Sequence, residues 1–229
     1  MWEQLAEEAP RFFGYYNMIF IAQAFGQTLA LSVLGALAGF VLGAFLAVLR
    51  HPRLVPFAPG RWLAISYVEI FRRIPFLVKL MCVFFAYQLA GAKVSMFTVA
   101  LTTVILSATA FAAEIVRAGL ESVHRNQWDA AETMNFAPAQ ALRLVLLPQA
   151  WKIIIPPSFS YVIGFIKSTS IASQIGVLEL TYAAKVLSTK GFSALLCYGT
   201  ILILYFLICW PTKLLGAHLE RRLGVSHTR

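Results

Sequence analysis

The sequence predicts an all-α integral membrane protein with about five transmembrane helices. Its 229 residues are 59% hydrophobic and only 13% charged, with a mean hydropathy of +0.74. That composition excludes a water-soluble globular domain. Spans of about twenty apolar residues match a hydrocarbon core of about 30 Å, and about five of them with short connections fill the chain. The sequence therefore predicts a single transmembrane domain over residues 1–229 and excludes a large extramembrane domain.

Three of the spans follow from uncharged length. The first covers about residues 24–49 and stops at the basic segment Arg50-His51-Pro52-Arg53. The third and the fifth cover about residues 94–115 and 191–212. Each contains an uncharged run long enough to cross the hydrocarbon core, so the sequence predicts a transmembrane helix at each place.

The second predicted span, about residues 62–90, contains charged residues and a proline. Pro75 is expected to break or kink the helix, because proline lacks an N–H and its ring clashes with the preceding turn. Glu69 lies three and four residues before Arg72 and Arg73, a spacing that predicts a local, structural salt bridge. Lys79 has no local partner in the sequence and can extend to the membrane surface if the helix begins near Pro75.

The fourth predicted span, about residues 157–177, is apolar apart from Lys167 and the hydroxyl residues that follow it. A charge inside a membrane costs at least ~2.5 kcal/mol, so Lys167 needs a partner, water or a function. We predict that it lines a solute pathway and favours a carboxylate-bearing solute, with local pairing as the alternative. The predicted pathway residues are Lys167, Thr169, Ser170, Ser173, Gln174, Glu69, Arg72 and Lys79.

The distribution of the 19 Lys and Arg residues predicts the orientation, because these residues accumulate in short cytoplasmic loops. With the N-terminus outside, the inner segments hold eleven of them and the outer segments four, and the other four lie within spans. This asymmetry favours an external N-terminus and a cytoplasmic C-terminus. The inner residues are Arg50, Arg53, Arg61, Arg117, Arg125, Arg143, Lys152, Lys213, Arg221, Arg222 and Arg229, and the outer residues are Arg11, Lys93, Lys185 and Lys190.

Several classes of function are excluded by the motifs of the chain. It has no Gly-Lys-Ser/Thr phosphate loop, no Gly-x-Ser-x-Gly and no His-Glu-x-x-His, so we expect no catalytic site and no ATPase activity of its own. Its three cysteines lie within spans and its four histidines on separate segments, so we expect no disulfide and no metal site. The net charge of +9 is spread over the inner loops, which favours the anionic membrane surface over nucleic acid.

A polar segment between the third and fourth spans, about residues 120–156, is helical in pattern but too polar to cross a bilayer. Asn126–Met134 predicts a short helix, which Asn135 can close in the left-handed conformation. Pro138 is well placed to start a second short helix, and Leu147-Pro148 is expected to end it. Two short helices joined by a tight turn form a compact projection, which we interpret as a binding element for a partner protein.

Three pieces of this segment, Asp129-Ala130-Ala131, Met134-Asn135 and Leu147-Pro148-Gln149, resemble the cytoplasmic signature of the permease subunits of ATP-binding-cassette (ABC) importers. The likeness is to the branch that imports polar amino acids and opines, the histidine, glutamine and arginine type. Asp129 stands where that signature has Glu, and Asn135 stands where it has Gly. Asp keeps the charge, and Asn is the next-best residue for a positive φ.

The resemblance covers roughly residues 25–225. Matching pieces open the first span at Gln27-Thr28-Leu29, run through Tyr67–Arg72 with Pro75 in the second, close the third at Ala113–Arg117 and continue through Lys167–Val177 in the fourth. The chain departs from the branch where solutes pass: Arg73-Ile74 replaces a common Gly-Thr, Lys79 a common Gln, and Ser168 a common Asp.

The resemblance implies the type I ABC importer permease fold in a bacterial inner membrane. It implies two permease chains, identical or related, around one pathway, two ATPase subunits that bind ATP and Mg²⁺, and a periplasmic or lipid-anchored solute-binding protein. The chain itself would bind no cofactor. The residues expected at the ATPase contact are Asp129, Ala130, Ala131, Met134, Asn135, Leu147 and Pro148.

Alternative interpretations remain open at this point. Intramembrane charges and a proline-interrupted span also suit a secondary transporter or channel driven by an ion gradient, although the sequence shows no inverted repeat. A membrane-anchored assembly protein would explain the spans but not the polar fourth one. The stripe Gly35, Gly39, Gly43 and Ala47 favours packing inside one subunit, with a subunit–subunit interface as the alternative.

Overall fold

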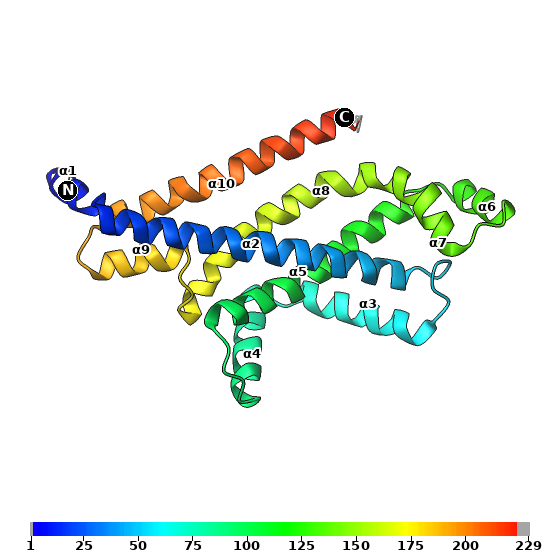
Figure 1. Cartoon of the computed structure of the whole chain (residues 1–229), viewed down its shortest axis with the longest axis horizontal. Helices are drawn as coiled ribbons and strands as arrows, with labels where there is room; N and C mark the ends of the chain where they lie inside the picture. Colours follow the sequence, from blue (N-terminus) through cyan, green and yellow to red (C-terminus); the bar gives the residue numbers. More distant parts are fainter. Residues whose placement is uncertain (1, 224–229) are drawn as a thin grey trace. The chain divides into compact units, whose positions relative to one another are not determined.

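The computed structural model describes residues 2–223, and every regular element in that range is helical. Figure 1 shows the helices in chain order. Arg229, which the sequence analysis assigned to an inner segment, lies outside the described residues. The elements are α1 (Trp2–Phe12), α2 (Tyr15–Arg50), α3 (Ala58–Arg73), α4 (Phe76–Leu89), α5 (Met96–Glu121), α6 (Arg125–Thr133), α7 (Pro138–Ala141), a π-helical turn η1 (Leu142–Leu146), α8 (Leu147–Ser168), a 3₁₀ segment η2 (Thr169–Ile175), α9 (Leu180–Thr189) and α10 (Ala194–Arg222).

The helices form two compact units. The first unit contains residues 2–35, Phe76–Val104 and Gly164–Pro211, and the second contains Ala36–Pro75, Ile105–Ile163 and residues 212–223. Helices α2, α5, α8 and α10 each contribute residues to both units. The predicted polar segment and the charged end of α3 belong to the second unit, whereas the polar part of the fourth span belongs to the first.

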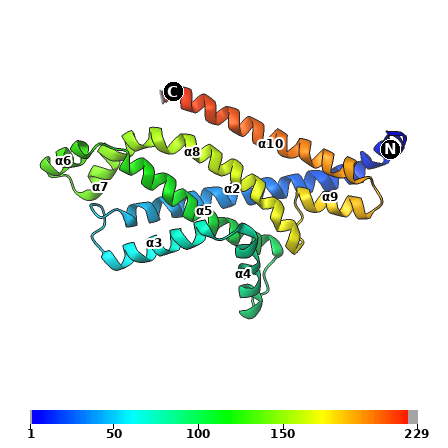
Figure 2. The same ribbon diagram turned by 180° about the vertical axis from the view of Figure 1, so that it is seen from behind.

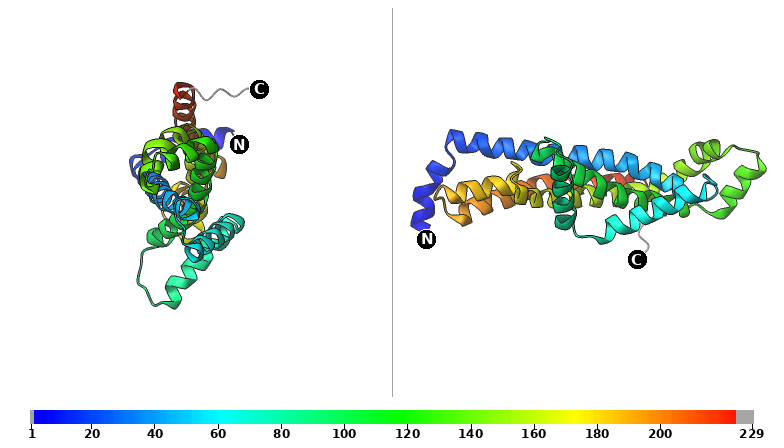
Figure 3. Two further views of the ribbon diagram at one scale, coloured as in Figure 1. Left: turned by 90° about the vertical axis from the view of Figure 1, so that its right-hand side faces the viewer. Right: turned by 90° about the horizontal axis from the view of Figure 1, so that it is seen from below.

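Within residues 2–223, three helices are each long and apolar enough to cross a membrane without a break, as predicted for the first, third and fifth spans: α2, α5 and α10. Helix α2 has 36 residues, roughly 54 Å at 1.5 Å per residue, so it extends beyond a hydrocarbon core of about 30 Å. It begins with Tyr15 and Tyr16, which are exposed, as is typical of aromatic residues at a membrane surface. A sharp turn at Gly14 separates it from α1, as Figure 3 shows.

The second predicted span is two helices rather than one, because α3 ends at Arg73 and α4 begins at Phe76. Ile74 between them is extended, with φ −82° and ψ 133°. The ring of Pro75 disfavours a helical conformation for the residue before it, so the predicted break is confirmed. Helix α4 has only 14 residues, roughly 21 Å, which is too short to cross the hydrocarbon core alone.

The prediction that Leu147-Pro148 ends a helix is wrong, because helical structure continues from Pro138 to Ile175. The turn before Pro148 is a π-turn, in which the N–H of Leu147 donates to the carbonyl of Leu142. The wider π-turn relieves the clash between a proline ring and the preceding turn, so Pro148 is accommodated inside the helix. The 3₁₀ segment then ends at Gly176, at φ 81°, and the path bends by 43° into α9.

The first unit is held together by an apolar cluster and a buried cap. The cluster consists of Leu31, Leu80, Ala100, Ala172 and Val177, so α2, α4, α5 and η2 meet there. At the start of α9 the N–H of Leu180 donates to the hydroxyl of Thr28, at 3.1 Å. Figure 2 shows α9 beside the N-terminal part of α2, as this bond requires.

The predicted glycine stripe is a close contact between α2 and α5. A Cβ atom at Gly39 would lie 2.3 Å from Cβ of Ala108, and one at Gly43 would lie 2.6 Å from Cβ of Ala112. Two carbon atoms cannot approach so closely, so only glycine fits at these positions. The stripe therefore packs inside the subunit, as the favoured interpretation held.

We expect Gly39→Leu to destabilise the protein by about 1–3 kcal/mol, because the added side chain must push α2 away from α5. Gly26→Leu on the same helix is the matched control, since nothing lies within 4 Å of a Cβ there. Thermal unfolding in detergent, followed by fluorescence-detected size exclusion, measures both. Equal melting temperatures for the two variants would contradict the close packing.

Candidate functional site

The polar segment folds as the predicted helix–turn–helix. Asn135 has φ 59° and is the only non-glycine residue of 2–223 with a positive φ. The N–H of Phe136 donates to the carbonyl of Ala131 at 3.1 Å, and that of Asn135 donates to Glu132 at 2.9 Å. These two bonds form a Schellman motif, the usual C-terminal closure with a left-handed residue. Asn135 therefore adopts the left-handed conformation at the position where the family signature has glycine.

Helix α7 begins at Pro138, as predicted. The side chain of Gln140 accepts a hydrogen bond from the N–H of Ala137 at 2.9 Å, which satisfies a donor at the helix start. We call residues 125–146 the α6–α7 hairpin; Figure 1 shows it beyond the adjoining ends of α5 and α8.

Trp128 anchors the hairpin to the rest of the second unit. Its side chain is buried and packs in a cluster with residues from α2, α5, α8 and the loop after α2. The ring of His51 stacks on it with centroids 4.3 Å apart and planes 1° from parallel. The cluster consists of Ala47, Leu54, Val116, Leu120, Val123, Trp128, Leu146, Ala150 and Ile154. The hairpin is therefore continuous with the ends of the membrane helices.

Arg53 adds an electrostatic link between the loop after α2 and α6. Its guanidinium donates to Asp129 at 3.0 Å, lies 3.5 Å from Glu132 and sits 5.8 Å from the Trp128 ring. Arg125 lies 3.7 Å from the same Asp129 carboxylate. Each of these ion pairs is exposed and worth at most about 1 kcal/mol, so together they orient α6 more than they stabilise it.

The structure divides the predicted ATPase-contact residues into two groups. Asp129, Ala130, Met134, Asn135 and Pro148 are exposed, and Met134 keeps 63% of its surface accessible. Ala131 is 2% exposed and Leu147 packs against the Trp128 cluster, so these two side chains face inward. Their place in the motif is explained by packing, and the exposed group alone is available to a partner.

A second cluster, around Glu114 on α5, was not predicted as a site. The Glu114 carboxylate accepts from Arg50 at 3.1 Å, lies 3.4 Å from Arg72 and is bonded to Arg117. Arg117 also pairs with Glu121. The spacing of Glu114 and Arg117 was a signal for their contact, but Arg50 and Arg72 come from distant segments.

The predicted salt bridge of the second span is therefore half right. Glu69 pairs with Arg73, at 2.6 Å, but Arg72 pairs with Glu114 instead.

Two cavities adjoin Arg72 and Phe111. One, of about 280 Å³, is lined by Glu69, Arg72, Arg73 and Phe111, and the other, of about 260 Å³, is lined by Arg72, Phe111, Glu114, Ile115, Ala118, Ile153 and Pro157.

The other predicted pathway residues lie in the first unit. Lys167 and Gln174 are exposed, whereas Thr169 and Ser173 are buried. The hydroxyls of Thr169, Ser170 and Ser173 donate to backbone carbonyls three residues earlier, at 2.7–2.8 Å. Their hydroxyls thus stabilise the 3₁₀ segment, and Lys167 and Gln174 are the members that reach the surface.

Lys79 does not extend to a membrane surface as the sequence suggested. It is 6% exposed, and its amine lies 5.9 Å from the centroid of the Phe76 ring. Its neighbour Leu80 packs against Ala172 in the core of the first unit. The α4 helix therefore buries this face against η2, which the sequence of α4 alone does not reveal.

Sequence analysis also missed Glu179, which is fully buried. Its carboxylate accepts from the N–H groups of Thr181 at 2.9 Å and Tyr182 at 2.7 Å, and from the hydroxyl of Tyr205 at 2.9 Å. It caps the start of α9, where an anion is favoured. The feature of the sequence that could have predicted this cap is an acidic residue directly before a short helical pattern.

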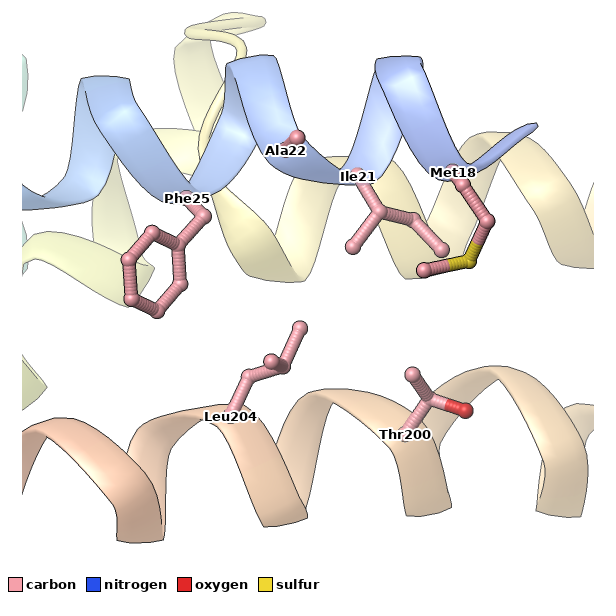
Figure 4. Close-up of a pocket in the computed structure, with 6 residues that line it drawn as sticks. All are labelled: Met18, Ile21, Ala22, Phe25, Thr200 and Leu204. Carbon is pink, nitrogen blue, oxygen red and sulfur yellow. The ribbon is translucent and has the colours of Figure 1, made fainter. Parts of the chain in front are cut away.

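The first unit also contains an apolar cavity of about 230 Å³ between α2 and α10. Figure 4 shows Met18, Ile21 and Phe25 of α2 pointing toward Leu204 and Thr200 of α10. These linings offer no charge to a polar solute, so the cavity suits apolar groups.

The stacked His51 makes the anchor of the hairpin sensitive to pH. Burial lowers the pKa of His51; the charge of Glu121 opposes that shift and the charge of Arg53 adds to it. Its Nδ1 atom is buried and has no hydrogen-bond partner among residues 2–223. Since the folded pKa lies below the unfolded value of about 6.5, the unfolded chain binds the proton first as pH falls.

We therefore expect the protein to lose thermal stability between pH 7.5 and pH 5.5, and His51→Phe to lose less, because Phe keeps the stack on Trp128 without titrating. Melting temperatures of both proteins at the two pH values measure the difference. His218→Phe is a control, since this residue lies on α10 outside the cluster. An equal loss for wild type and His51→Phe would contradict the assignment.

Comparison with known proteins identifies the family. The family described as "Binding-protein-dependent transport system inner membrane component" matches residues 39–225. Among similar proteins of Bacillus subtilis, the probable glutamine ABC transporter permease protein GlnM is 32% identical over 211 residues, 92% of this chain and 96% of that protein. The L-cystine transport system permease protein TcyB is 33% identical and aligned over 86% of this chain and 83% of its own.

Solved structures agree with these matches. An amino acid ABC transporter crystallised with histidines has a chain that superposes with a TM-score of 0.81 at 29% identity, over 90% of this chain and 94% of that one. The fold is also shared with the MetNI methionine ABC transporter in an inward-facing conformation, with a TM-score of 0.79 at 22% identity, over 92% and 99% of the two chains. With its type I importer fold and its membrane-spanning helices, this chain belongs to the family of binding-protein-dependent transport system inner membrane components.

Proposed function

We propose that this chain pairs with a second permease chain, identical or related, to form the translocation pathway of an ATP-driven importer for polar amino acids or related solutes. The solute class is supported by the relatives, which include permeases named for glutamine, L-cystine and arginine transport. A periplasmic or lipid-anchored binding protein delivers the solute, and a separate pair of ATPase subunits binds ATP and Mg²⁺. An ion-gradient transporter is disfavoured by membership of the family.

The proposal includes an orientation of the chain in the membrane. With the N-terminus outside, the α6–α7 hairpin and the C-terminal end of α10 lie in the cytoplasm, where the ATPase is. The excess of Lys and Arg on those segments supports this orientation.

The observation that carries the proposal is the hairpin itself: an exposed helix–turn–helix whose inner face is fixed into the ends of three membrane helices. Met134 and Ala130 present an apolar patch beside the charged Asp129. When a partner binds this patch and moves, it displaces Trp128 and, through the buried cluster, the ends of α2, α5 and α8. Rigid packing transmits such a displacement, because interiors are close-packed.

We expect Asn135→Pro and Asp129→Lys to uncouple ATP hydrolysis from uptake while membrane insertion is retained. Proline has φ near −65° and cannot adopt the 59° of Asn135, and it removes the N–H that donates to Glu132. Lys at position 129 would place a third cation beside Arg53 and Arg125. Uptake and ATPase activity of the assembled complex in proteoliposomes measure the coupling.

Asn135→Gly is the matched control for the turn. Glycine accepts the left-handed conformation without strain, so coupling should be kept and the stability raised by up to ~1 kcal/mol. Normal uptake in both Asn135→Pro and Asp129→Lys would rule out the hairpin as the coupling element.

We also propose that Lys167 faces the solute pathway, since it is exposed on the polar end of α8 and Gln174 of the following η2 segment is exposed as well. Lys167→Met should raise the solute concentration for half-maximal ATPase stimulation by about tenfold or more, because a charge-assisted contact to a carboxylate is lost. Lys185→Met on α9, also exposed, is the control. Stimulation by solute that is unchanged in Lys167→Met would exclude the role.

A further inference from the structure

The second unit contains a cavity in which one cation and one anion share apolar walls. Arg72 of α3 and Glu114 of α5 both line this space of about 260 Å³. The remaining lining is apolar and comes from α5 and α8: Phe111, Ile115, Ala118, Ile153 and Pro157. We call it the Arg72–Glu114 cavity.

The two charges are not held equally. Glu114 is fixed by Arg50 at 3.1 Å and by Arg117, and its side chain is only 21% exposed. Arg72 approaches the same carboxylate at 3.4 Å, and its side chain is 37% exposed. Its neighbour Arg73 is paired within α3 by Glu69. Arg72 is therefore the arginine of this cluster that can exchange its ion-pair partner with the smallest loss of stability.

We propose that the Arg72–Glu114 cavity binds the charged backbone groups of a free α-amino acid. The Arg72 guanidinium takes the α-carboxylate, Glu114 takes the α-ammonium, and the solute side chain lies along Phe111 and the apolar wall. This inference rests on the proposed function in amino-acid import and adds a site and a mode of recognition to it.

Charge balance favours a zwitterion over a solute with a single charge. When the amino acid enters, the direct contact between Arg72 and Glu114 is exchanged for one contact of each with the solute. Every partly buried charge then keeps an opposite charge beside it, which avoids the large penalty for an unpaired one. An amine without a carboxylate would separate Arg72 from Glu114 and leave the Arg72 guanidinium without an anionic partner. The cavity therefore discriminates against such an amine.

The geometry of the cation suits a carboxylate. Guanidinium presents a planar fork of N–H donors that matches two carboxylate oxygens, and it remains charged at any relevant pH. The Arg72 guanidinium lies 6.0 Å from the centroid of Phe111, which is 39% exposed. That ring stabilises the cation through a cation–π contact, and both side chains line the cavity.

The size of the cavity limits the ligand. Sites for drug-sized molecules usually measure about 300–1,000 Å³, and this one is smaller, at about 260 Å³. A single amino acid is the right scale, and a peptide is not. The position also fits transport, since α3 ends one residue after Arg72 at the break before Pro75, and interrupted helices are where transporters place binding groups.

The test uses the complete transporter, with its ATPase and binding protein, in proteoliposomes. Uptake of L-glutamine, L-arginine and L-cystine is measured first, and the best-transported one becomes the probe. Its binding to the permease–ATPase complex without binding protein is then titrated by calorimetry, beside its decarboxylated and its deaminated analogue. Phosphoethanolamine is included, because a phospholipid headgroup also combines an ammonium with an anion.

The wild-type complex should bind the amino acid at least tenfold more tightly than either analogue. Arg72→Gln should weaken amino-acid binding at least tenfold, remove the preference over the decarboxylated amine and keep the preference over the deaminated acid. A purely structural role for Arg72 would not erase one preference alone. Arg73→Gln makes the same change of charge one residue away, outside this cavity, and should bind within twofold of wild type.

Ala118→Leu provides a second, uncharged variant that fills the cavity, and it decides the matter if Arg72→Gln fails to assemble. It should weaken amino-acid binding at least tenfold. Wild-type binding in Ala118→Leu, a retained preference over the amine in Arg72→Gln, or equally tight binding of phosphoethanolamine would overturn the inference. Absence of uptake of all three amino acids by wild type would instead refute the proposed solute class.

Discussion

The contact between α2 and α5 at Gly39 and Gly43 is the constraint on which the second unit depends. Because no side chain separates the two helices there, the end of α2 stays close to α5, and Arg50 reaches Glu114. The chain then leaves α2 directly into His51 and Arg53, which hold Trp128 and Asp129 of α6. Thus a run of small residues in the membrane determines where a polar hairpin is attached outside it.

The sequence was sufficient for features that depend on local chemistry. Uncharged length predicted α2, α5 and α10, Pro75 predicted the break between α3 and α4, and the rarity of a positive φ outside glycine pointed to Asn135. Pro138 likewise marked the start of α7. At Pro75, Pro138 and Asn135 the residue type limits the backbone conformation, and in the three long helices the uncharged length alone is decisive, so neighbours in space have little influence on these results.

Features that depend on distant partners were not predictable. Arg72 has an equally good local partner in Glu69, and only the fold reveals that Glu114 is the one it contacts. The burial of Ala131 and of Lys79 depends on which face each helix turns inward. The prediction that a helix ends at Pro148 was wrong for a related reason, because a π-turn ahead of Pro148 removes the steric clash that normally ends a helix at proline.

Helices α5 and α8 connect the two candidate sites of the second unit. On α8, Ile153 lines the Arg72–Glu114 cavity while the next residue, Ile154, packs in the Trp128 cluster. On α5, Glu114 lies at the cavity and Val116 and Leu120 lie in the cluster. A Cβ atom at Gly119 would lie 2.3 Å from the side chain of Ile154, so these two helices are also in tight contact. Closely packed helices move as a body or change register, rather than deform. A solute that separates Arg72 from Glu114 and a partner that displaces Trp128 therefore act on the same pair of helices, which gives the two sites a physical means of coupling.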